Sequence, residues 1–138
     1  LLLDTIPSII DGTAKYYPQD ESEVTFGLNV QKEEEKIDFS KTSLEVKNLV
    51  RGLNSVPGAY CILDGKRLKV YEVRVLSDSV NDYPCGYIVR VDNEGIIVRC
   101  GDGYIKILDI ALEGKKRCLV KDYFNGIDKN SLVGKVLE

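Results

Sequence analysis

Histidine is absent from this chain of 138 residues. It is the usual general base near neutral pH and the usual partner of a nucleophilic serine or cysteine, so those mechanisms are not available within the chain. Catalysis would have to use carboxylates, lysine, tyrosine or cysteine. We expect no catalytic residue and no metal ligand here, and this absence limits the function more than any motif does.

Methionine and long apolar runs are also missing. A start without an initiator methionine predicts that the numbering begins inside a longer protein. No stretch approaches the roughly 20 apolar residues that span a bilayer. Leu1-Leu2-Leu3 lacks the basic flank and the longer apolar core of a signal peptide. We therefore expect a cytoplasmic protein with no membrane partner.

Cysteines are few and irregularly spaced. Cys61, Cys85, Cys100 and Cys118 form no Cys-x-x-Cys pair, and there is no histidine to complete a metal site. The pattern predicts reduced thiols that pack as small apolar side chains, rather than a disulfide framework.

Charge divides the chain into two parts. With 43% hydrophobic and 30% charged residues, the chain can bury one core, so we expect one domain with an extension. Residues 1–40 carry nine acidic and three basic side chains, whereas residues 41–138 carry sixteen basic and thirteen acidic ones. The net charge of −3 argues against a high-affinity, stand-alone nucleic-acid binder, although the second part is basic.

The first part has two expected segments. Residues 1–14 are apolar at helical spacing, with Pro7 a kink and Gly12 an end signal, and we interpret them as the end of a preceding domain. Residues 15–38 are polar and acidic, which indicates a linker across a surface.

An amphipathic helix is predicted next. Apolar residues recur at helical spacing from Phe39 to Leu53, and Thr42 with Glu45 fits a capping box. Pro57-Gly58 follows its end.

Short β segments with turn residues between them follow. Asp64-Gly65 predicts a tight hairpin, and a change of alternation near Tyr71-Glu72 predicts a bulge. Gly101-Asp102-Gly103 joins strand to strand, so we interpret it as a turn rather than a phosphate cradle. A short helical turn should close at Gly126. The strands are expected at residues 59–63, 67–75, 86–91, 96–100, 104–112 and 132–137.

These elements predict a mainly β fold: a small OB-like barrel over residues 39–138, preceded by one amphipathic helix and the N-terminal linker. Such a barrel alone indicates only a binding module. Several basic residues could form a patch that contacts phosphates without reading sequence. They are Arg51, Arg67, Lys69, Lys106, Lys115, Lys116 and Arg117. Alternatively, Arg51 only complements the helix dipole, and residues 115–117 are only a solvated loop.

A series of motifs is similar to the linker and C-terminal domain of the methionyl-tRNA formyltransferase family, in the same order and at similar spacing over nearly the whole chain. They are Gly12, Pro18-Gln19-Asp20-Glu21, Lys32-Glu33-Glu34, Ile37-Asp38-Phe39-Ser40, Asn48-Leu49-Val50-Arg51-Gly52-Leu53-Asn54, Pro57-Gly58-Ala59, Cys100-Gly101-Asp102-Gly103, Glu113-Gly114-Lys115-Lys116-Arg117 and Phe124-Asn125-Gly126. The resemblance implies an OB-like domain that follows a Rossmann-type catalytic domain. It also implies transfer of a formyl group from 10-formyltetrahydrofolate to the methionine of initiator methionyl-tRNA.

The resemblance places the family's catalytic Asn, His and Asp and its folate pocket in the N-terminal domain, outside this chain. It implies a fragment that is inactive by itself, has no cofactor, and positions initiator tRNA beside its own catalytic domain, as a monomer. The turn Asn54-Ser55-Val56-Pro57 lacks a proline and an aromatic ring of the family pattern. Two alternatives stay open. The barrel could belong to another folate-dependent formyltransferase or hydrolase, such as a 10-formyltetrahydrofolate dehydrogenase or a sugar-nucleotide formyltransferase, or it could be purely structural.

Overall fold

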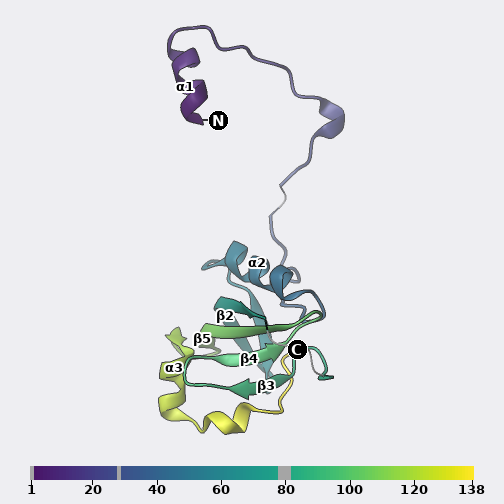
Figure 1. The fold of residues 1–138 in the computed structure, drawn as a ribbon, viewed down its shortest axis with the longest axis vertical. Coiled ribbons are helices and arrows are strands. Elements are labelled where there is room, and N and C mark those ends of the chain that lie inside the picture. The colour runs from purple at the N-terminus through teal and green to yellow at the C-terminus, as the bar shows by residue number, and fades with distance from the viewer. Residues whose placement is uncertain (1, 28, 78–81) are drawn as a thin grey trace.

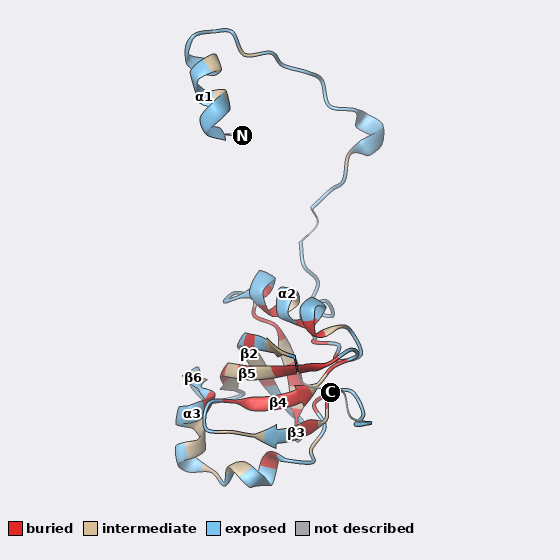
Figure 2. Cartoon of the chain, in the orientation of Figure 1, coloured by how far each residue is buried: buried red, intermediate tan, exposed pale blue. Residues whose placement is uncertain are grey.

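The computed structural model describes residues 2–27, 29–77 and 82–138, which form a β domain preceded by an extended N-terminal arm (Figure 1). The arm contains helix α1 (Leu2–Ile10) and a 3-10 turn, η1 (Glu21–Glu23). The helix predicted within residues 1–14 is confirmed as α1, and Gly12 follows it with φ 75°. No residue of α1 is buried, and Figure 2 shows the helix in pale blue and tan, without red. Within the described ranges, no helix has the length and apolar character needed to cross a membrane.

Helix α2 (Ser43–Leu53) has the predicted capping box. The Thr42 hydroxyl accepts a hydrogen bond of 3.2 Å from the Glu45 amide, and the Glu45 carboxylate accepts one of 2.9 Å from the Thr42 amide. Asp102, which is distant in sequence, also caps the N-terminus of α2, because its carboxylate accepts a hydrogen bond of 2.6 Å from the Ser43 amide. The predicted turn at residues 101–103 therefore also fixes the start of α2 against the sheet.

The sheet is antiparallel, with the strand order β1-β2-β5-β4-β3 and a short β6 beside β5. The strands are β1 (Tyr60–Leu63), β2 (Lys66–Leu76), β3 (Ile88–Val91), β4 (Ile96–Arg99), β5 (Tyr104–Leu112) and β6 (Cys118–Leu119). The Asp64-Gly65 hairpin is confirmed, with both residues at positive φ. The bulge is confirmed too, because the register with β5 shifts on both sides of Glu72.

Two short helical elements and a 3-10 turn follow the sheet. Helix α3 (Val120–Tyr123) continues into η2 (Phe124–Gly126), which confirms the helical turn closed by Gly126. The prediction of a last strand at residues 132–137 is wrong. Leu132, the first residue of the expected strand, ends a third 3-10 turn, η3 (Lys129–Leu132). Within residues 132–137, only Val136 forms a β-bridge, with Tyr87.

The segment 134–138 nevertheless joins the two edge strands. On the β3 side, the Gly134 amide donates to Ile88 O at 2.9 Å, and the Leu137 amide donates to Gly86 O at 2.8 Å. On the β1 side, Glu138 and Ile62 exchange two backbone hydrogen bonds, of 2.7 and 3.1 Å. The curled sheet is thereby closed into a small barrel. No ladder of regular strand pairs forms, because the segment divides its hydrogen bonds between two partners.

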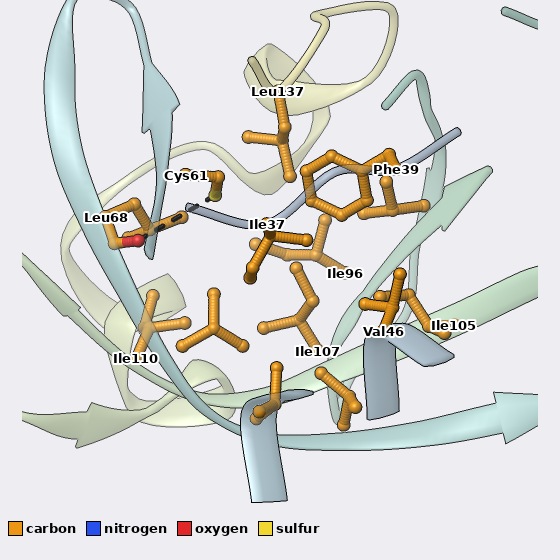
Figure 3. Close-up of a cluster of buried hydrophobic side chains, with 14 of the residues drawn as sticks. Ile37, Phe39, Val46, Cys61, Leu68, Ile96, Ile105, Ile107, Ile110 and Leu137 are labelled. Carbon is orange, nitrogen blue, oxygen red and sulfur yellow. Dashed lines mark hydrogen bonds between the residues drawn. The ribbon is translucent and has the colours of Figure 1, made fainter. Parts of the chain in front are cut away.

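One core fills the barrel and continues under α2 (Figures 2 and 3). Leu68, Ile107 and Ile110 from the central strands meet Val46 of α2 in this cluster. Ile37, which the sequence assigned to the linker, is only 2% exposed, and its amide donates to Tyr60 O at 2.7 Å. Ile37 therefore belongs to the core of the β domain, and the Tyr60 amide also donates to Glu35 O at 2.9 Å. Burial of this apolar cluster is the main stabilising contribution to such a fold.

All four cysteines are free, which confirms the prediction that they form no disulfide. Cys61 and Cys100 are buried, and burial raises the pKa of each thiol to about 12. Cys85 is exposed, so the expectation of buried packing is wrong for that residue.

We expect iodoacetamide at pH 8 to label Cys85 first in the native protein. The thiolate is the reacting form, and the raised pKa and burial of Cys61 and Cys100 leave almost none of it accessible. Mass spectrometry of timed samples measures the four rates, and denatured protein, in which all four should react, is the control. Labelling of Cys61 at the rate of Cys85 in folded protein would contradict the assigned burial.

Candidate nucleic-acid interface

The outer face of strands β1 and β2 carries basic and aromatic side chains. In β2, Leu68 and Val70 are buried in the core, so Arg67 and Lys69 project from the opposite face. The register places Tyr60 of β1 opposite Lys69. Alternation in the sequence predicted this wet face, and the structure confirms it.

A surface groove of about 620 Å³ lies between the β1–β2 hairpin and the loop after β5. Three of the predicted site residues line it together: Arg67, Lys69 and Lys115. We call this the basic groove. Its remaining lining residues are Ile62, Gly65, Ala111, Leu112, Glu113 and Gly114. Only one of them, Glu113, is acidic, so cationic groups predominate in the groove.

Arg67 is held in a defined position. Its guanidinium lies over the Tyr60 ring, 4.3 Å from the ring centroid. Its backbone is tied to Glu113, because the Arg67 amide donates to the Glu113 carboxylate at 3.1 Å and Arg67 O accepts the Glu113 amide at 2.8 Å. A guanidinium stacked on a ring keeps its N–H groups free at the edge, where they can bind a phosphate through two hydrogen bonds.

Lys69 has a structural partner. Its ammonium donates to Pro57 O at 2.6 Å, and the side-chain amide of Asn54 donates to Tyr71 O at 3.0 Å. These two bonds attach the turn after α2 to β2. An ammonium has three donors, so Lys69 keeps two for another acceptor in the groove.

The loop between β5 and β6 carries the predicted basic run. The Lys115 ammonium lies 5.4 Å from the centroid of the Tyr123 ring. Lys116 is exposed, and no hydrogen bond or ion pair joins it to another residue in the described ranges. Arg117 instead forms an ion pair: its Nε and Nη2 donate to one carboxylate oxygen of Asp109, at 2.9 and 2.7 Å.

Four of the seven predicted residues do not line the groove: Lys116 and Arg117 of this loop, and Lys106 and Arg51. Lys106 forms ion pairs with Asp92 at 2.6 Å and with Glu94 at 3.2 Å, and its side chain is only 13% exposed. The hydrogen bond to Asp92 raises the pKa of Lys106, so its charge is permanent but already compensated. Arg51 is exposed in the last turn of α2, where a cation complements the helix dipole.

Sequence reasoning missed two residues that contact the predicted site residues. Tyr60 was assigned to a strand, but its stacking under Arg67 depends on the register of the hairpin. Asp109 was assigned only to a strand, although a lone carboxylate in the run Ile107-Leu108-Asp109-Ile110 signals a buried charge that needs a partner.

Known proteins resemble this chain in both sequence and fold. Residues 29–128 match the family described as formyl transferase, C-terminal domain. The methionyl-tRNA formyltransferase of Lactobacillus gasseri is 40% identical over 126 residues, which is 91% of this chain and 40% of that protein. The one from Staphylococcus aureus is 39% identical over 138 residues, which is 99% of this chain and 44% of that protein. This chain therefore spans about two-fifths of the curated relatives it matches.

Solved structures of HypX from Aquifex aeolicus share the fold. One variant superposes with a TM-score of 0.64 at 15% identity, over 93% of this chain and 23% of HypX. HypX in complex with tetrahydrofolic acid gives a TM-score of 0.61 at 16% identity, over 89% of this chain and 22% of HypX. The family match covers more than half of the sequence and the whole sheet. This chain accordingly belongs to the formyl transferase C-terminal domain family.

Proposed function

We propose that this chain is the tRNA-positioning part of a methionyl-tRNA formyltransferase, which transfers a formyl group from 10-formyltetrahydrofolate to the methionine of initiator methionyl-tRNA. The observation that carries the proposal is the basic groove, in which Arg67, Lys69 and Lys115 meet on one face of a domain whose sequence relatives bear that name. The chemistry and the folate site belong to a catalytic domain outside this chain, so the chain by itself is inactive.

The groove suits the backbone of an RNA helix. Double-stranded RNA is recognised mainly by shape and by phosphate and 2′-hydroxyl contacts, because side chains cannot read the bases in its deep, narrow major groove. Cations held on the sheet and on the adjoining loop therefore position the acceptor stem without selecting sequence. Formyl transfer needs such positioning, because the aminoacyl end must be held close to the formyl donor. The proposed working state is a cytoplasmic monomer in which the barrel and its catalytic domain hold one tRNA.

Titration of the 138-residue chain with initiator tRNA in a salt series tests the proposal. Three phosphate contacts should give a slope of log affinity against log salt of roughly −2.7, which is a loss of about 40-fold between 50 and 200 mM salt. Lys41→Gln, which removes an exposed cation that does not line the groove, should keep the slope of the unmodified chain.

A chimera relates binding to catalysis. In it, this chain replaces the corresponding part of the Lactobacillus gasseri enzyme, which is 40% identical to it. We expect the chimera to formylate initiator methionyl-tRNA with the same salt dependence. Absence of RNA binding at low salt by both proteins would contradict the proposal. Loss of stability without loss of tRNA affinity, on removal of the barrel, would indicate the purely structural alternative.

A further inference from the structure

Arg117 is anchored on both sides, unlike the two lysines that precede it. Its guanidinium lies over the Tyr71 ring, 4.1 Å from the centroid, and two of its nitrogens donate to Asp109. The side chain of Asp109 is only 11% exposed, whereas that of Arg117 is 45% exposed. The guanidinium thus covers the carboxylate of Asp109, which is nearly buried in strand β5.

This arrangement leaves little net charge for a phosphate. Two opposite charges 2.7 Å apart act at longer range as a dipole, so Arg117 adds far less to the positive potential than a free lysine does. Its planar guanidinium, with one face on Tyr71, is also restricted in orientation. Arg117 therefore acts as a local anchor more than as an RNA ligand.

The anchor controls a short loop. The loop leaves β5 at Leu112 and returns as β6 at Cys118, and it carries Lys115 and Lys116. β6 is only two residues long, so its pairing with β5 constrains the end of the loop weakly. The Arg117–Asp109 pair supplies a side-chain attachment to β5 at the same end of the loop.

We propose that Asp109 and Tyr71 are positioning residues, which hold Arg117 and thereby fix the loop that presents Lys115 and Lys116 to RNA phosphates. This inference rests on the proposed function for its RNA partner, but the anchoring of the loop can be measured without RNA. The other oxygen of Asp109, Oδ1, is buried and accepts no hydrogen bond from the described residues, so the carboxylate depends on Arg117 for its compensation.

The variant Asp109→Asn should change the affinity for RNA in opposite directions under the two possible roles of Asp109. If Asp109 were only a negative charge beside the RNA, its removal would strengthen binding. If it anchors the loop, the variant binds initiator tRNA about three- to tenfold more weakly at 100 mM salt, despite its more positive charge. Tyr71→Leu, which changes no charge, should weaken binding in the same direction, and Tyr71→Phe, which keeps the ring, should bind like the unmodified chain.

The rate of trypsin cleavage within the loop measures how firmly the loop is held. Asp109→Asn and Tyr71→Leu keep all three cleavage sites of the loop, and we expect both to be cut after Lys115 or Lys116 at least five times faster than the unmodified chain or Tyr71→Phe. Thermal unfolding must show that each variant is folded at the assay temperature. If Asp109→Asn does not fold, Tyr71→Leu decides the result.

Unchanged cleavage in these variants, or tighter RNA binding by Asp109→Asn, would overturn the inference. If the unmodified chain and the chimera bind no RNA while cleavage accelerates as expected, the anchor is real, but the proposed function and the RNA part of the inference fail. The two failures are therefore distinguishable.

Discussion

Alanine in place of Gly86 should lower the free energy of unfolding by about 3–5 kcal/mol. Gly86 has φ 82°, a conformation that costs an L residue roughly 1–2 kcal/mol. An added Cβ would also meet Leu137 O inside van der Waals contact. That carbonyl belongs to the segment that closes the barrel, and Gly86 O accepts the Leu137 amide at 2.8 Å. Relief of the clash separates these groups and loses hydrogen bonds worth about 1 kcal/mol each.

Urea unfolding followed by far-UV circular dichroism measures this loss. Gly65→Ala is the matched control, because Gly65 has a similar φ of 74° but nothing within 4 Å of an added Cβ. It should lose only the conformational contribution of roughly 1–2 kcal/mol. Equal losses in the two variants would mean that the closing segment moves aside at no cost, and the clash argument would be wrong.

The double variant Arg67→Gln, Lys115→Gln should bind initiator tRNA about 60-fold more weakly at 100 mM salt. Each phosphate contact contributes roughly 0.9 to the slope of log affinity against log salt, so two lost contacts remove a factor of about 60 at 0.1 M relative to 1 M salt. The slope itself should become flatter by about two. Filter binding in a salt series, with the chain and with the chimera, gives both quantities.

The control for this variant is the pair Lys41→Gln, Lys106→Gln, which also removes two positive charges. Lys41 does not line the groove, and Lys106 is already paired with Asp92 and Glu94. We expect little change in the salt slope from this pair. An equal loss of affinity in the two double variants would show that net charge, rather than the basic groove, attracts the RNA.

Local patterns in the sequence predicted the elements that depend on neighbouring residues. The Thr42–Glu45 capping box, the Asp64-Gly65 hairpin and the bulge near Glu72 all lie within a few residues of their signals. For the same reason, the alternation in β2 correctly placed Arg67 and Lys69 on the outer face.

Features that depend on distant partners could not be predicted in this way. Lys106 is compensated by the turn between β3 and β4, which the pairing of Lys106 with Ile97 brings close. The pairing of Arg117 with Asp109 likewise needs the return of β6 beside β5. Their basic side chains look alike in sequence, so only the structure separates compensated cations from those of the groove.

The closure of the barrel by residues 134–138 has a consequence for biosynthesis. Until this segment has left the ribosome, one edge of β3 lacks its partner, the Ile62 backbone of β1 is unpaired on one side, and Leu137 is missing from the core. Without residues 134–138, the chain is therefore an open folding intermediate that is prone to aggregate. Closure of the barrel is therefore a late folding step, and a released chain truncated before residue 134 would keep a sheet edge able to pair with another polypeptide.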